Sequence, residues 1–247
     1  MGGARQRLRT SRLFVVNVEG GKMKRVQKGF TLVEIAIVLV IIGLLLGGIL
    51  KGQEMITQAK IKNVAADFTG MSAGYLGFQD RYRALPGDDG GAAARWASAP
   101  AAISGNGNGQ VAGSYNADCS AASPPESCLW WDHLRRAGFV SGSGARQPGN
   151  ALAGLVGVQT GDAGGTIGPV LGTDASGTGG FTGLMLCSAN LPDKIALAID
   201  AQLDDGVPST GSVRAQLQSE PNPAVAKQAA TAYAETGSNQ YLVCRTL

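Results

Sequence analysis

One carboxylate stands inside the most apolar stretch of the chain. Residues 28–34 read KGFTLVE, and Glu34 is the only charged residue between Phe30 and Leu50. A charged side chain in hydrocarbon costs about 2.5–3.5 kcal/mol on insertion scales, so an acid at this place predicts a functional site with a positively charged partner. Snorkelling of Glu34 to the near membrane interface is the alternative, because the acid lies close to the start of the apolar run.

A second group of acids follows much later in the chain. Asp200, Asp204 and Asp205 come just before Gly206. Carboxylate oxygens suit calcium, but their spacing does not match an EF-hand loop. Acids in a turn are usually solvated, so a calcium site formed by these three residues is the lesser alternative to a solvated turn.

The remaining chemistry-bearing residues predict no catalytic site. The sequence has no P-loop, no dinucleotide fingerprint and no convincing Ser/His/Asp order. His133 is the only histidine, and one histidine without partners does not make a zinc site of the usual kind, so we expect a structural role. Arg135 and Arg136 favour a solvated helix face over a nucleic-acid contact. We therefore expect no enzymatic activity, no cofactor and no nucleic-acid partner.

All four cysteines follow the apolar run, at positions 119, 128, 187 and 244. If the C-terminal part is exported, they lie in an oxidising compartment, where disulfides form. Four cysteines allow three pairings. A zinc site is the alternative, although no C-x-x-C pair is present.

The position of Glu34 depends on the apolar run that contains it. Its 21 residues, Phe30 to Leu50, span about 30 Å as a helix, which is the thickness of one bilayer core. Residues 1–29 hold eight basic residues and one acid, a net charge of +7, which leaves −4 for residues 30–247 of the total of +3. The basic side of a membrane segment stays in the cytoplasm, so the C-terminal bulk is expected outside it. A cleaved secretory signal is the alternative, but the GGILKGQEM that follows offers no good A-x-A site.

The helix is expected to continue beyond the bilayer through residues 51–85. Its apolar positions are spaced three and four residues apart, which predicts a stripe along one face. Pro86 and the PGDDGG turn predict an end near Leu85, and one helix over Phe30–Tyr82 results. The stripe predicts a globular domain packed against it, and a coiled-coil stalk is the alternative. The stripe consists of Ile61, Val64, Phe68, Met71, Tyr75, Phe78 and Tyr82.

Residues 86–247 form the expected head. The periodicity of apolar residues is weak over residues 86–180, and only one element is predicted there: a short helix over Cys128–Ala137, which Gly138 ends. A strand over Phe181–Cys187, a helix over Pro192–Leu203 with Pro192 in its first turn, a strand starting in SVRA and a closing strand in NQYLVCRTL complete it. The fold class expected is α+β: a long N-terminal helix packed on a head with a small antiparallel sheet.

Taken together, the basic leader, the GFTLVE segment at residues 29–34 and the apolar helix resemble the type IV pilin-like family, which includes type IV pilins, minor pilins and type II secretion pseudopilins. The resemblance covers roughly residues 23–85 and is weaker in the C-terminal region. It implies that a membrane peptidase cuts between Gly29 and Phe30 and then methylates the amino group of Phe30. It also implies that Glu34 pairs with the amino terminus of a neighbouring subunit during assembly. One departure is Lys51, which stands where many members have a proline.

The resemblance implies a structural subunit with three kinds of partner: the prepilin peptidase and methyltransferase, other pilin or pseudopilin subunits, and an inner-membrane assembly platform. The subunit would wait in the bacterial inner membrane, with a cytoplasmic N-terminus and a periplasmic head, before it enters a filament. Residues 1–29 are the leader to be removed, and translation is expected to start at Met23, since family leaders are often short. The large, unusual head favours a minor pilin. A pseudopilin, or a membrane-tethered adhesin or DNA-uptake receptor, are the alternatives.

Pilins commonly close their C-terminal region with a disulfide. We therefore favour Cys187–Cys244, which would tie the last strand to the head, together with Cys119–Cys128 across a short loop.

Overall fold

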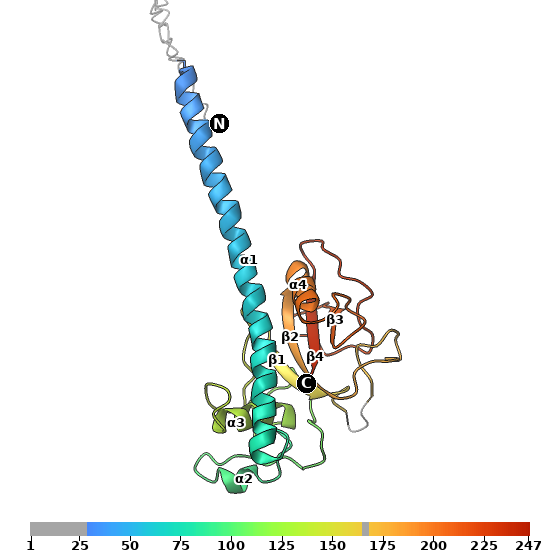
Figure 1. Ribbon diagram of the computed structural model, residues 1–247. Coiled ribbons are helices and arrows are strands. Elements are labelled where there is room, and N and C mark those ends of the chain that lie inside the picture. The colour runs from blue at the N-terminus through green and yellow to red at the C-terminus, as the bar shows by residue number, and fades with distance from the viewer. Residues whose placement is uncertain (1–28, 165–167) are drawn as a thin grey trace, which may run out of the picture. The chain divides into compact units, whose positions relative to one another are not determined.

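The computed structural model describes residues 29–164 and 168–247 (Figure 1). The leader, including the expected start at Met23, lies outside the described residues. Two units are distinguished, one up to Ile49 and one from Leu50 to Leu247. In chain order the elements are α1 (Leu32–Tyr82), α2 (Ala92–Arg95), α3 (Glu126–Arg136), β1 (Val156–Thr160), β2 (Leu184–Pro192), α4 (Asp193–Leu203), β3 (Val213–Leu217) and β4 (Gln240–Thr246).

The first unit contains the apolar part of α1. This part of the helix is exposed on every side, and α1 is long and apolar enough to cross a membrane. The helix begins at Leu32, two residues after the expected start at Phe30, because Thr31 acts as its N-terminal cap. An apolar surface around the whole circumference favours lipid or other apolar helices as its surroundings.

The second unit starts with the amphipathic part of α1. Ile61, Val64, Phe68, Tyr75 and Phe78 are buried, and the other two members of the expected stripe are partly buried against the same core. The stripe thus packs on a head, as predicted, and not in a coiled-coil stalk. The helix ends at Tyr82 and not near Leu85, because Arg83 takes a positive φ of 53° that breaks the helical path.

The sheet has the order β1-β2-β4-β3, and all its pairs are antiparallel. Its two faces bury different clusters, since successive side chains of a strand point to opposite faces. Tyr241 and Val243 of β4 pack with α1 and α4, whereas Leu242 and Cys244 pack with Tyr115 and the other loop residues behind the sheet. Figure 1 shows α4 beside β2 and β4. The expected α+β head with a small antiparallel sheet is therefore present.

Loops cover both edges of this sheet. At β1, the Thr160 amide donates to the Val111 carbonyl at 3.2 Å. At β3, the Ala215 amide donates to the Pro208 carbonyl at 2.9 Å, and the Ala215 carbonyl accepts from the Ala230 amide at 2.7 Å. Covered edges do not offer a template for adding a strand from another chain.

Several expected boundaries in the head were wrong. The strand expected at Phe181–Cys187 runs instead from Leu184 to Pro192. Pro192 is consequently the N-cap of α4 and not part of its first turn. The helix expected from Cys128 already begins at Glu126, after Pro125. β1 was not predicted, because its five residues, VGVQT, form a short segment within a stretch of weak periodicity.

Candidate functional site

The candidate site lies at the start of α1, where Thr31 and Glu34 hydrogen-bond to each other. The Glu34 amide donates to Thr31 Oγ1 at 3.2 Å. In return, Glu34 Oε2 accepts from the Thr31 amide and from the Thr31 hydroxyl, both at 2.8 Å. Reciprocal bonds between a threonine before the first turn and a glutamate three residues later form a capping box.

This capping box gives Glu34 a role within its own chain. The first amides of a helix have no partner inside the helix, and a carboxylate in the first turn also interacts favourably with the positive end of the helix dipole. Glu34 Oε2 satisfies one such amide, whereas Glu34 Oε1 accepts no hydrogen bond from residues 29–164 or 168–247. One oxygen therefore caps the helix, and the other has no donor among the residues that the structure describes.

The role of Thr31 was missed in the sequence, although its signal was present. A threonine followed three residues later by a glutamate, ahead of an apolar run, is the sequence pattern of a capping box. The GFTLVE segment contains that pattern, and its spacing alone would have identified Thr31.

The two residues of the expected scissile bond precede the helix. Gly29 and Phe30 lie outside regular structure, and the side chain of Phe30 is 83% exposed. A Cβ added to Gly29 would meet no atom within 4 Å. Nothing in the described part of the chain therefore covers this peptide bond.

A family model described as the prokaryotic N-terminal methylation motif matches residues 24–50. The chain carries the N-terminus of a type IV pilin-like prepilin. The motif and the long apolar helix fit a membrane-anchored protein with a single span. No curated protein and no solved structure matches the chain.

Both favoured cysteine pairs are present in the head of the prepilin. Cys119 is bonded to Cys128, nine residues along the chain, and Cys187 is bonded to Cys244, 57 residues along the chain. Cys187 and Cys244 lie opposite each other on β2 and β4 and are fully buried. With all four sulfur atoms in disulfides, the zinc alternative has no thiolate ligand.

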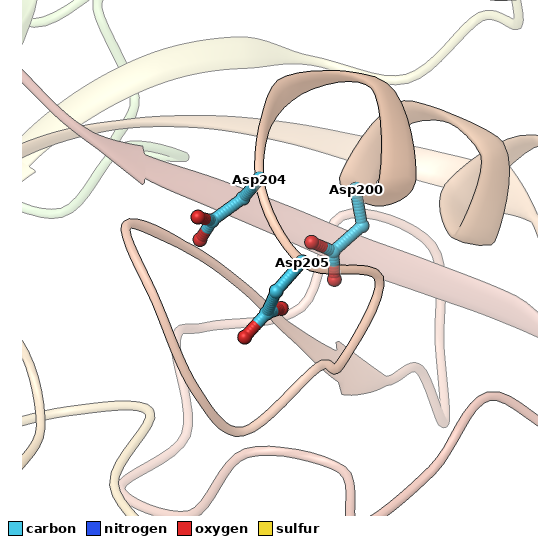
Figure 2. Close-up of side chains that lie close together, drawn as sticks. All are labelled: Asp200, Asp204 and Asp205. Carbon is cyan, nitrogen blue, oxygen red and sulfur yellow. The ribbon is translucent and has the colours of Figure 1, made fainter.

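The three aspartates at the end of α4 do come together, with carboxylate oxygens within 4.8 Å of one another (Figure 2). Asp200 is buried, while Asp204 and Asp205 are exposed. The Tyr233 hydroxyl donates to Asp200 Oδ2 at 2.6 Å. Burial raises the pKa of Asp200 above its ordinary value of 3.8, and the hydrogen bond from Tyr233 opposes that change.

Asp204 and Asp205 order the loop that follows α4. Asp204 Oδ2 accepts from the amides of Ser212 and, at 2.9 Å, Val213. Asp205 accepts from the Thr210 hydroxyl at 2.5 Å. These bonds explain the cluster as a local brace between α4 and β3. Calcium binding by the three aspartates stays the lesser alternative that the sequence left open.

The basic residues of α3 are used inside the chain. Arg136 Nε lies 2.6 Å from Asp132 Oδ2. Arg135 donates to the carbonyls of Gly144 and Arg146 at 2.7 and 2.6 Å. Arg136 Nη2 also donates to the Pro100 carbonyl at 2.9 Å. Both guanidinium groups thus tie α3 to neighbouring loops, so they do not lie on the freely solvated helix face that was expected, and they are engaged within the chain rather than free for an anionic surface.

Proposed function

We propose that this prepilin is a structural subunit of a type IV pilus-like filament. A prepilin peptidase cuts it between Gly29 and Phe30, the new amino group of Phe30 is methylated, and an inner-membrane platform assembles the subunit through α1. The observation that carries the proposal is the methylation motif over residues 24–50, which continues into an exposed apolar helix. The motif implies a structural protein.

Glu34 supplies the countercharge in this proposal. Cleavage turns the Phe30 nitrogen into an ammonium group, which is costly among apolar helices unless it is paired. Glu34 Oε2 caps its own helix, and Glu34 Oε1 accepts no hydrogen bond within the described residues. The open oxygen can therefore accept from the ammonium group of a neighbouring subunit without breaking the cap.

The span is oriented with its N-terminus in the cytoplasm and the head in the periplasm. The net charge of +7 over residues 1–29 supports this orientation, because basic residues remain on the cytoplasmic side. The two disulfides of the head need an oxidising compartment and support it as well.

A minor pilin is the subunit type that we propose. Its support is the size of the head, which spans residues 86–247 and is built largely from loops. Recovery of the subunit at low, constant ratio in sheared pili would agree with this assignment. Recovery only with a secretion complex would favour a pseudopilin, and permanent residence in the membrane fraction would favour a tethered adhesin or DNA-uptake receptor.

The experiment that tests the role of Glu34 separates its charge from its cap. Glutamine serves in a capping box as glutamate does, so Glu34→Gln keeps the cap and removes only the charge. Thr31→Val is the matched variant, because it removes the cap and keeps the charge. Cells carrying each variant are sheared, and both the filament and the membrane fractions are probed with an antibody to the head.

We expect Glu34→Gln to be inserted and cleaved, but to accumulate in the membrane as processed protein. Thr31→Val should still enter filaments, since it retains the countercharge. Gly29→Val is the control for processing and should keep its leader. Recovery of processed Glu34→Gln in filaments at the wild-type level would refute the ion-pair role and favour snorkelling.

A further inference from the structure

The single histidine of the chain is fully buried between three parts of the head. His133 lies on α3 and has no exposed surface. The Gly87 amide donates to His133 Nδ1 at 2.9 Å, and His133 Nε2 lies 2.8 Å from the Ile103 carbonyl. A backbone amide only donates and a carbonyl only accepts. His133 is therefore fixed as the neutral tautomer with its proton on Nε2.

These two bonds fasten both ends of one segment. Gly87 opens and Ile103 closes a stretch of chain that includes α2 and follows the C-terminal end of α1. The segment carries Trp96, whose ring lies 5.5 Å from that of Tyr82. The Phe78 ring stacks on the His133 imidazole at 6.4 Å with an interplanar angle of 11°. The imidazole thus anchors the segment over the rings of Phe78, Tyr82 and Trp96 at the C-terminal end of α1.

The charged groups around the imidazole compensate an added proton only in part, because Asp89 and Asp132 favour the charged ring, Arg136 disfavours it, and burial of the ring outweighs them. Asp89 of the fastened segment is paired with Arg95, and Asp132 of α3 is paired with Arg136. No carboxylate hydrogen-bonds to the ring, because both of its nitrogens are taken by backbone groups. A proton added to Nδ1 would point at the Gly87 N–H, so the charged ring cannot keep both bonds.

We propose that His133 is an acid-sensitive latch, which in its neutral form fastens residues 87–103 over Phe78, Tyr82 and Trp96 and which releases the segment when it is protonated. The pKa of His133 is lowered from its ordinary value of 6.5, chiefly by burial. The unfolded chain consequently binds a proton more readily than the folded one. Stability from the latch is therefore present above about pH 6.5 and is lost as the pH falls below that value.

The test follows the imidazole directly in the processed protein, held in detergent micelles with its whole α1 helix. Because the chain has one histidine, ¹⁵N- and ¹³C-labelling of histidine alone gives a single set of ring signals. We expect ¹⁵N shifts of the Nε2-protonated tautomer at about pH 7.5 and a titration midpoint below about 6.5. A midpoint one unit below that reference means that the imidazole binds a proton ten times more weakly in the folded protein than in the unfolded chain.

Hydrogen exchange measured by mass spectrometry shows whether the segment is released. After correction for intrinsic exchange, peptides from residues 87–103 should lose protection between about pH 7.5 and pH 5.5, while peptides from β4 keep theirs. His133→Gln is the control, because its amide both donates and accepts but does not charge. It should remove the pH dependence of residues 87–103.

Three results would overturn the latch. The first is a midpoint of His133 at or above about 6.5, and the second is a ring protonated on Nδ1 at neutral pH. The third is unchanged protection of residues 87–103 across the titration. All three are read from the wild-type protein, so they decide the question even if His133→Gln does not fold.

Discussion

Three glycines in the amphipathic part of α1 provide a sharp test of how the head packs on the helix. Alanine is about 1 kcal/mol more favourable than glycine inside a helix, so the same gain is expected at each position before packing is considered. A Cβ at Gly70 would meet nothing within 4 Å, and one at Gly74 would lie 3.5 Å from Phe139 Cβ. A Cβ at Gly77 would lie 2.6 Å from Phe139 Cε1, well inside van der Waals contact.

The three substitutions are therefore expected to differ in sign. Gly70→Ala should raise the free energy of unfolding by about 1 kcal/mol. Gly74→Ala should raise it by about 1–2 kcal/mol, because the new methyl is buried in ordinary contact. Gly77→Ala pushes the Phe139 ring off the helix, and overpacking of this kind costs about 1–3 kcal/mol. Its net effect should lie between no change and a loss of about 2 kcal/mol.

Urea unfolding of the full-length protein in micelles measures these changes. All three tryptophans of the chain, at positions 96, 130 and 131, lie in the second unit and report its unfolding by fluorescence. Phe139→Ala removes the clash, so Gly77→Ala in that background should regain a stabilisation of about 1 kcal/mol.

Phe139 is 37% exposed, so displacing its ring is expected to cost its contact with α1 while leaving the rest of the core in place. If Gly77→Ala stabilised the protein as much as Gly70→Ala while Phe139 is present, the predicted contact between this ring and α1 would be wrong.

Two further predictions concern the head. Replacing both cysteines of the Cys187–Cys244 disulfide with alanine should lower the free energy of unfolding by about 4 kcal/mol, because this disulfide closes a loop of 57 residues. The same change at Cys119–Cys128, which closes a loop of nine residues, should lower it by about 2.6 kcal/mol. Equal losses in urea unfolding would contradict the loop-closure explanation. Asp200→Asn should keep the Tyr233 hydrogen bond and remove a titrating group whose pKa is raised by burial. The folded wild type binds the proton on Asp200 more tightly than the unfolded wild type does. The free energy of unfolding of the wild type, relative to that of the variant, should therefore fall as the pH rises through the range just above 3.8. A difference between the two proteins that does not change with pH would count against this burial effect.

Features that depend on near neighbours were readable in the sequence. The apolar run from Phe30 has the length of a membrane-spanning helix, and the stripe from Ile61 to Tyr82 repeats with the period of a helix, so these two patterns predicted both parts of α1. Thr31 and Glu34 belong to the same class, because a capping box joins residues three apart. That box could have been predicted and was overlooked.

Features that depend on distant partners were decided by the tertiary structure. β1 is a short segment within a stretch of weak periodicity and is covered on both faces, and its pairing with β2 makes it a strand. His133 was expected to be structural, but nothing near it in the chain reveals its partners. Its partners Gly87 and Ile103 lie 46 and 30 residues away, and only the folded head brings their backbone groups to the two ring nitrogens. A buried polar group must be satisfied by whatever the fold places beside it, and local sequence does not specify that neighbour.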